Sequence, residues 1–218
     1  MLEFLPALLR GALVTVQITL AASLVALVIG VVVGLAKLST NGFVRALAVG
    51  YIEFFRGTSL LVQLFWWFFV LPHFGIFLAP MVVGIVGIGM NVGAYGAEVV
   101  RGAIQAVPRG QYEAAIALNM SPAARMRRII LPQAVLAMLP PWGNLLIELL
   151  KGTALVSLIT IHDLTFIGHS ENMRTFRTVE IFTLVLVIYY LLGRGLITPS
   201  VRWLERHFSR GLGQRRSA

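Results

Sequence analysis

The sequence contains no cysteine and few charged residues. Without cysteine the chain forms no disulfide, has no thiolate nucleophile and offers no sulfur ligand to a metal. Its four histidines also lack the paired spacing of a zinc site. Charged residues make up 12% of the 218 residues and hydrophobic residues 58%, whereas soluble domains carry about 25% charged residues. This composition indicates a membrane protein, and the length allows one membrane domain.

The sequence also lacks the motifs of common enzyme chemistry. A phosphate-binding Walker A loop needs Gly-Lys followed by Ser or Thr, and neither Lys37 nor Lys151 follows a glycine. No HExxH or GxSxG motif is present, and the carboxylates do not cluster as in a metal or glycosidase site. We therefore expect a protein that is not an enzyme. Any chemical energy that it uses must come from another chain.

Long uncharged stretches predict an all-α membrane protein with five transmembrane helices. Residues 11–36 are uncharged and exceed the about 20 residues that a helix needs to cross a bilayer. Residues 57–97 carry no charge and are long enough for two spans, separated by an apolar hairpin at residues 72–80. The last two spans are expected at residues 129–147 and 181–201.

Local features refine this prediction. Gly30 and Gly34 have a small-xxx-small spacing, which either lets another helix approach closely or arises by chance in a glycine-rich span. Residues 129–147 contain three prolines and Gly143, so we expect an interrupted span that lines the interior. Residues 153–161 are too short to cross the membrane and are expected to form a partly inserted helix.

The polar segments carry their basic residues unevenly. The connection at residues 37–56 holds three basic residues, residues 101–128 hold five and the chain from Arg194 onward holds six. The opposite side, which includes the connection at 162–180, holds four. The positive-inside rule therefore places the three richer segments in the cytoplasm. This distribution explains the net charge of +9 without nucleic acid.

The orientation divides the chain into three parts. We expect residues 1–10 to form a short extracytoplasmic N-terminus, residues 11–201 the membrane domain and residues 202–218 a basic cytoplasmic tail with disorder at its last residues. The chain start lacks the basic region of a secretory signal, so we expect the first apolar stretch to be retained as a span.

Residues 111–132 are the longest stretch that cannot be a membrane span. Good helix formers run over residues 111–118 and predict a short helix. Ser121 suits the N-cap of a second helix and Pro122 its first turn. Between them, Asn119 is expected to end the first helix with a positive φ, which Asn tolerates better than any residue except Gly. The result is a small knob on the cytoplasmic side.

This stretch resembles the EAA loop of the permease subunits of bacterial ABC importers. The matching residues, at the family's spacing, are Glu113-Ala114-Ala115, then Asn119 in place of the usual Gly, then Ile129-x-Leu131-Pro132. Residues 56–63 and 94–102 are similar to the polar amino-acid uptake branch of that family. The resemblance covers about residues 10–205.

The resemblance implies a fold and a set of partners. The fold is that of a type I ABC importer permease, with a coupling loop at residues 101–128 whose short helix docks on a cytoplasmic ATPase subunit. The partners are ABC ATPase subunits, a second permease copy or homologous permease, and an extracytoplasmic solute-binding protein. The cargo is a polar amino acid or a small zwitterionic solute such as ectoine, and the location is the bacterial inner membrane.

Six residues of the loop are candidates for contact with the ATPase: Glu113, Ala114, Ala115, Ile116, Leu118 and Asn119. Glu113 either meets a basic group of the partner or only favours the helix dipole. Small side chains at Ala114 and Ala115 suit tight insertion, although Ala is also ordinary helix filler. Basic residues of the second helix either touch the partner or anchor the chain on anionic lipid: Arg125, Arg127 and Arg128.

A second candidate site follows the proline-rich span. Glu148 and Lys151 border the membrane, where ionisable groups are costly unless they are hydrated or paired. They either face a substrate path or form an ion pair at the water boundary. Thr153 and Ser157 are expected to add hydroxyl groups to the same wall.

Two other classes of function compete with an ABC permease. An ion-coupled secondary transporter needs no ATPase, but such folds often contain repeats and no internal similarity is visible here. A membrane scaffold that transports nothing does not need the polar breaks or the cytoplasmic loop.

Overall fold

The computed structural model describes residues 2–211, and every element in that range is helical. The α-helices, in chain order, are α1 (Leu5–Lys37), α2 (Gly42–Gly57), α3 (Leu60–Phe65), α4 (Pro80–Gln105), α5 (Arg109–Ala117), α6 (Pro122–Arg125), α7 (Leu131–Gly152), α8 (Leu164–Thr175), α9 (Thr178–Leu191) and α10 (Thr198–Gly211). Wider π-helical turns occupy Trp66–Val70, Met126–Ile130 and Leu192–Ile197, and 3-10 turns occupy Leu2–Phe4, Leu71–Phe74 and Thr153–Ile159.

Four helical segments are long and apolar enough to cross a membrane: Leu5–Lys37, Pro80–Gln105, Pro122–Ile159 and Thr178–Phe208. A fifth candidate is the pair Gly42–Gly57 and Leu60–Phe74, which passes the same test together but bends by 101° at its break. The predicted total of five spans is reached when this bent pair counts as one.

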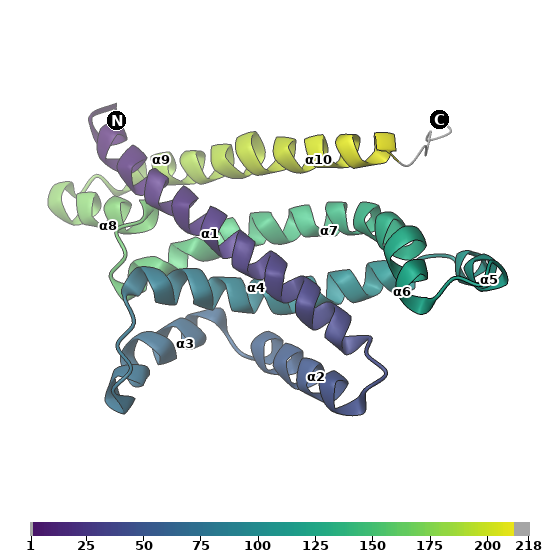
Figure 1. The fold of residues 1–218 in the computed structure, drawn as a ribbon. Helices are drawn as coiled ribbons and strands as arrows, with labels where there is room; N and C mark the ends of the chain where they lie inside the picture. The colour runs from purple at the N-terminus through teal and green to yellow at the C-terminus, as the bar shows by residue number, and fades with distance from the viewer. Residues whose placement is uncertain (1, 212–218) are drawn as a thin grey trace.

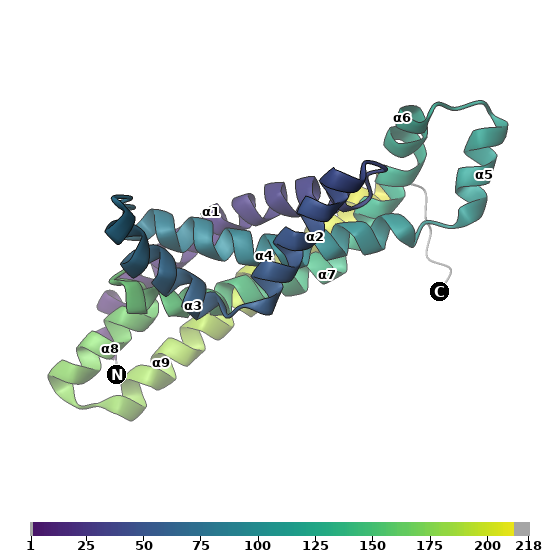
Figure 2. The ribbon, with the colours of Figure 1, turned by 90° about the horizontal axis from the view of Figure 1, so that it is seen from below.

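The bundle has two distinct ends. Figures 1 and 2 show α5, α6 and the end of α10 at one end, together with the turn between α1 and α2. The start of α1 and helix α8 lie at the opposite end. Parts of all three segments that the sequence assigns to the cytoplasm therefore share one end of the molecule.

Small residues bring α1 and α4 into close contact. A Cβ added at Gly34 would lie 2.8 Å from the Ala97 carbonyl oxygen, and one at Gly93 would lie 2.8 Å from the Ile29 side chain. A Cβ at Gly30 or Gly96 would clash with the ring of Trp142, which α7 inserts beside them. The close approach predicted for Gly30 and Gly34 is confirmed, and α4 supplies the facing glycines.

Three charged residues join α1 and α4 at the end of this contact. Lys37 donates to one carboxylate oxygen of Glu98. Arg101 donates from Nε to the other oxygen at 2.9 Å, as the spacing of Glu98 and Arg101 along the helix permits. The carboxylate is therefore shared between the two helices, which ties the last turn of α1 to α4.

Residues 37–56 are not the polar connection that the sequence predicts, because most of them form α2. The Asn41 side chain caps this helix by accepting from the Phe43 and Val44 amides. Ala48, Ile52 and Phe55 are buried at a spacing of one helical turn. The charged residues lie on the other faces, so an amphipathic helix was mistaken for a connection.

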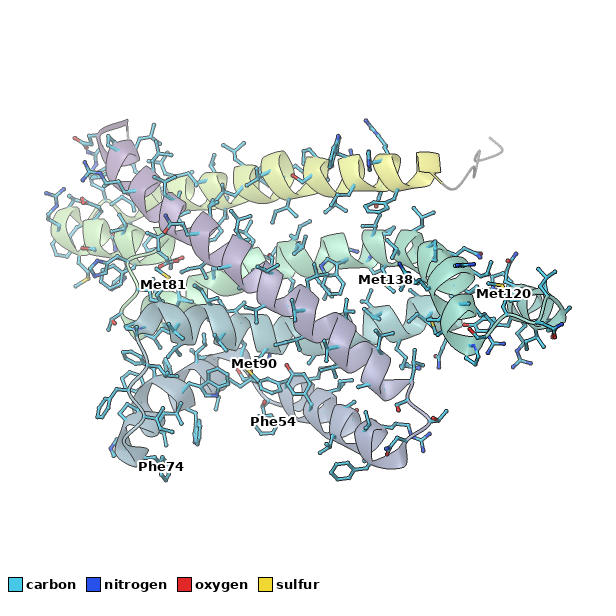
Figure 3. All side chains as sticks on the ribbon, in the orientation of Figure 1. Phe54, Phe74, Met81, Met90, Met120 and Met138 are labelled. Carbon is cyan, nitrogen blue, oxygen red and sulfur yellow. The ribbon has the colours of Figure 1, made fainter. Side chains whose placement is uncertain are left out.

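A polar cluster supports the bend between α2 and α3. The Phe55 carbonyl accepts from the Gln63 amide at 3.1 Å and from the Asn91 amide at 3.0 Å. Gln63 also donates to the Thr58 hydroxyl at 2.6 Å. Because a bend frees backbone carbonyls that lipid cannot satisfy, these buried amides allow it within the bundle. Figure 3 shows Phe54 and Phe74, one on each side of the bend, pointing away from the bundle.

The helices that contain the last two predicted spans extend beyond the predicted span ends. Helical structure continues from Pro122 to Ile159, so the segment at residues 153–161 is the tightened end of this span and not a separate inserted helix. Pro140 and Pro141 lie inside α7 without interrupting it. The last span continues as a helix to Phe208, which places the start of the predicted tail in α10. Residues 212–218 of that tail lie outside the described residues.

The contact between α1 and α4 generates a test. Gly96→Val adds a branched side chain where even a Cβ would lie 2.6 Å from the Trp142 ring. We expect it to lower the unfolding free energy by about 1–3 kcal/mol, the usual cost of overpacking. Thermal unfolding in detergent measures this. Gly50→Val, where no heavy atom lies within 4 Å, is the control and should unfold close to wild type. Equal stability of the two variants would contradict the role of Gly96.

Candidate functional site

Helix α5 stands at the far end of the molecule, beyond α6 and away from the main bundle (Figure 2). One side of it is held to the rest of the chain. The Tyr112 hydroxyl donates to the Ile104 carbonyl at 3.1 Å, which links α5 to the end of α4. Ala115 lies on the same side and is only 2% exposed. The helix is therefore a fixed part of the fold, with its other faces open.

The turn after α5 has the geometry of a Schellman motif. Asn119 has a φ of 52°, and its amide donates to the Ile116 carbonyl at 2.8 Å. The Met120 amide reaches back to the Ala115 carbonyl at 3.0 Å, and Figure 3 labels Met120 at this turn. These two bonds define the motif. The positive φ predicted for Asn119 is confirmed, and Asn preserves the backbone geometry that Gly would adopt.

The second helix of the knob begins as the sequence predicts. The Ser121 hydroxyl accepts from the Ala124 amide at 3.3 Å, and Pro122 occupies the first turn. The helix then widens into the π-helical turn Met126–Ile130 before it enters the long span. Arg127 and Arg128 on this turn are exposed, and Arg125 is half-buried.

Five of the six predicted docking residues face outward. Glu113, Ala114 and Asn119 are exposed, and the two larger apolar side chains, Ile116 and Leu118, are 58% and 74% exposed. Ala115 is the exception, since its side chain packs into the chain and its carbonyl forms the turn. Apolar side chains held in the open on a rigid, polar-rimmed helix have the character of a protein contact surface.

The structure separates the four residues predicted for a substrate path. Glu148 and Lys151 are exposed, and no ion pair joins them within the described part of the chain. Thr153 is fully buried and donates to the Leu150 carbonyl at 2.7 Å. Ser157 is half-buried and donates to the Ala154 carbonyl at 2.7 Å. The two hydroxyls satisfy their own helix, so the shared wall with Glu148 and Lys151 is not formed.

One exposed residue that the sequence reading missed completes a polar stripe on α7. Asn144 is exposed four residues before Glu148, and Lys151 follows three residues after Glu148. This spacing places all three on one helix face. The spacing of Asn144 relative to Glu148 was the signal that could have identified it.

The span that carries this stripe is the least buried of the four. Only 17% of its most apolar window is buried, against 61% for the span Pro80–Gln105. This span is therefore mostly open in a single chain, and the expectation that it lines an interior stays a prediction. A membrane helix that exposes Asn, Glu and Lys on one face needs water or a further protein surface beside it.

The end opposite the knob contains a buried carboxylate that sequence reasoning also missed. Asp163 is fully buried and caps α8 by accepting from the Phe166 amide at 2.9 Å and the Thr165 amide at 3.2 Å. The Tyr189 hydroxyl donates to it from α9 at 3.3 Å. Burial raises the pKa of the Asp163 carboxyl, and the hydrogen bonds oppose that shift in part. The cap joins α8 to the last span.

Comparison with known proteins identifies the class. A family model for the binding-protein-dependent transport system inner membrane component matches residues 26–210. The chain belongs to this family. Its members are the non-catalytic permease subunits of ABC transporters, in which a separate subunit hydrolyses ATP.

Two relatives are similar to this chain over almost its whole length. A probable amino-acid ABC transporter permease of Sinorhizobium fredii is 47% identical over 223 residues, which cover 98% of this chain and 92% of that protein. The glutamine transport system permease of Escherichia coli strain K12 is 35% identical over 204 residues, or 93% of each chain.

Solved structures confirm the fold. An amino acid ABC transporter with histidines superimposes with a TM-score of 0.88 at 34% identity, covering 95% of this chain and 96% of the other. The inward-facing MetNI methionine ABC transporter gives a TM-score of 0.79 at 21% identity, over 94% and 98% of the two chains, and shares the fold. The predicted type I importer permease fold is correct.

The turn at Asn119 generates a second test. Asn119→Gly keeps access to positive φ and should leave transport close to wild type. Asn119→Val places a branched residue in that conformation, which costs on the order of 1–2 kcal/mol and displaces the knob. Uptake in cells, normalised to the amount of inserted protein, measures both. Equal uptake by the Gly and Val variants would show that the turn geometry has no part in transport.

Proposed function

We propose that this chain imports polar amino acids as one half of an ATP-driven transporter. Two permease chains would form the path across the membrane, two ATPase subunits would bind their cytoplasmic knobs, and an extracytoplasmic solute-binding protein would deliver the solute. The relatives named as amino-acid and glutamine permeases support this class of solute. A related zwitterion such as ectoine has the same pair of opposite charges.

The observation that carries this proposal is the exposed, rigid knob. ATP binding in one protein moves the membrane helices of another only if a stiff element joins them. Helix α5 meets this requirement, because Tyr112 and Ala115 fix its inner side while Ile116 and Leu118 remain exposed for a partner. Glu113 adds a carboxylate on the open surface that suits a basic group of the ATPase.

The polar stripe on α7 supports a substrate path between two permease chains. Glu148 and Lys151 offer opposite charges on one helix face, and Asn144 adds an amide. An amino acid presents a cationic ammonium and an anionic carboxylate, so this face matches its chemistry. A second permease copy opposite α7 would enclose the stripe, and alternating access would expose it to each side in turn. Thr153 and Ser157 belong to the supporting helix and not to this face.

The distribution of basic residues supports the orientation. The end with the knob carries Arg127 and Arg128 in exposed positions, and we place it in the cytoplasm of a bacterial inner membrane. The same arginines are suited to anionic lipid at the membrane surface. The N-terminus then lies outside and the C-terminus inside.

Ala114→Trp tests the docking role of the knob. A Trp on the exposed face of α5 would prevent close seating on the ATPase, so we expect uptake to fall by at least about tenfold, a loss of about 1.4 kcal/mol of productive docking. Membrane insertion should not change, because Ala114 is exposed in the chain itself. Ala114→Ser is the matched control and should transport normally. Uptake near wild type in the Trp variant, or failure of the chain to co-purify with any ATPase, would exclude this mechanism.

Glu148→Gln and Lys151→Met test the substrate path. Each removes one charge from the exposed stripe, and we expect uptake to fall about tenfold or more in each case while the amount of protein is maintained. Radiolabelled amino-acid uptake measures the effect. Glu53→Gln, an exposed carboxylate on α2, is the control and should have little effect. If the double variant regains the activity that either single variant loses, the two groups form a structural pair and line no path.

A further inference from the structure

A cleft of 830 Å³ lies between the ends of α4, α7 and α10. Helices α7 and α10 meet at Gly143, where a Cβ would lie 2.8 Å from the Val201 side chain. Beyond this contact, towards the end that carries the knob, they form opposite walls of the cleft with Ala137 and Arg202. The last residues of α4 form the third wall. The contact at Gly143 therefore adjoins the cleft, whose lining includes Pro140 and Arg202.

The wall from α10 is charged. Arg202 and Arg206 line the cleft one helical turn apart, with Glu205 between them. Two guanidinium groups and one carboxylate give these charged lining residues a net charge of +1. Guanidinium groups arranged in this way bind phosphate through paired hydrogen bonds.

The facing wall from α7 offers acceptors. Pro140 and Pro141 have no amide hydrogen, so the carbonyls four residues earlier, on Leu136 and Ala137, lose their usual helical donors. Leu136 and Ala137 both line the cleft. A ligand with hydroxyl groups can donate to these carbonyls while an acidic group meets the arginines opposite. The wall formed by α4 and the turn after it is apolar, with Ala103 and Val107 among the lining residues.

The cleft lies at the level expected for lipid headgroups. Trp203 follows Arg202 on α10 and is 63% exposed, and an exposed Trp next to Arg at the end of a span is typical of the membrane interface. The end of α10 is also at the same end of the molecule as α5 and α6 (Figure 1). By the orientation proposed above, this is the cytoplasmic leaflet.

We propose that this cleft binds the headgroup of an anionic phospholipid of the phosphatidylglycerol type. The phosphate contacts Arg202 and Arg206, and the glycerol hydroxyls donate to the carbonyls of Leu136 and Ala137. The apolar wall from α4 packs against the glycerol backbone and the first methylene groups. Bound lipid would wedge α10 against α4 and α7. This site depends on neither the identity of the solute nor the docking of the ATPase.

The test uses the full-length chain in neutral detergent and native mass spectrometry with two lipids, phosphatidylglycerol and phosphatidylcholine. We expect wild type to retain phosphatidylglycerol at least about tenfold more strongly. Arg202→Gln with Arg206→Gln should reduce this preference to near that for phosphatidylcholine. The matched control is Arg45→Gln with Arg109→Gln, which removes the same charge from two exposed positions outside the cleft. It should keep the preference.

A second variant shows whether a loss of lipid binding comes from the cleft or from misfolding of the arginine variant. Ala106→Trp fills the cleft from an exposed position at the end of α4 and leaves every charge in place. It should also lose the preference for phosphatidylglycerol. Soluble glycerol 3-phosphate and glutamine are added as separate competitors, and neither should displace the lipid. The proposal would be overturned if both cleft variants kept the preference for phosphatidylglycerol, or if the control lost it to the same degree. Displacement of the lipid by either soluble compound would also overturn it.

Discussion

The close contact between α1 and α4 determines what the other helices can do. In lipid, apolar side chains gain little by leaving one apolar surface for another, so helices associate through dispersion contacts at short range. Glycines at positions 30, 34, 93 and 96 allow that range, and Trp142 fills the space beside two of them from α7. Because three helices meet at this point, the position of α7 depends on glycines of α1 and α4.

Backbone polar groups impose the second constraint, since each break in a membrane helix leaves carbonyls that lipid cannot satisfy. At two such places, nearby buried side chains form hydrogen bonds with the free backbone groups. At the bend before α3, the Gln63 and Asn91 amides serve the Phe55 carbonyl. At the start of α8, the Asp163 carboxylate serves two free amides. In α7, Leu136 and Ala137, whose carbonyls lose helical donors to Pro140 and Pro141, line a cleft, and this difference makes that site a candidate for a ligand.

Much of the fold could be predicted from the sequence, because uncharged length and turn chemistry are local properties. The positive φ at Asn119 and the cap at Ser121 depend on one or two residues each, and both were correct. A search for uncharged runs does not find helix α2, because Arg45 and Glu53 interrupt the segment, although Ile52 and its apolar neighbours follow a helical spacing.

The candidate site was predicted less completely than the fold. Thr153 was grouped with Glu148, yet five residues along a helix turn it by about 140°, which points it into the core. The motif and the small side chains group Ala115 with Ala114, but the packing of α5 buries only Ala115. The direction in which a side chain points depends on contacts with distant segments. The burial of Thr153 and Ala115 could therefore not be predicted from one stretch of sequence.

The unbroken helical path from Pro122 to Ile159 has a mechanical consequence. Glu148 lies 17 residues beyond Leu131, the first residue of α7, which corresponds to a lever arm of roughly 26 Å along this helix. A tilt of about five degrees at the start of α7 therefore moves Glu148 sideways by about 2 Å, enough to break a hydrogen bond. The π-helical turn Met126–Ile130 and the two adjacent prolines are the softest joints along this arm. Stiffening either joint would change how far a movement at the start of the helix displaces Glu148.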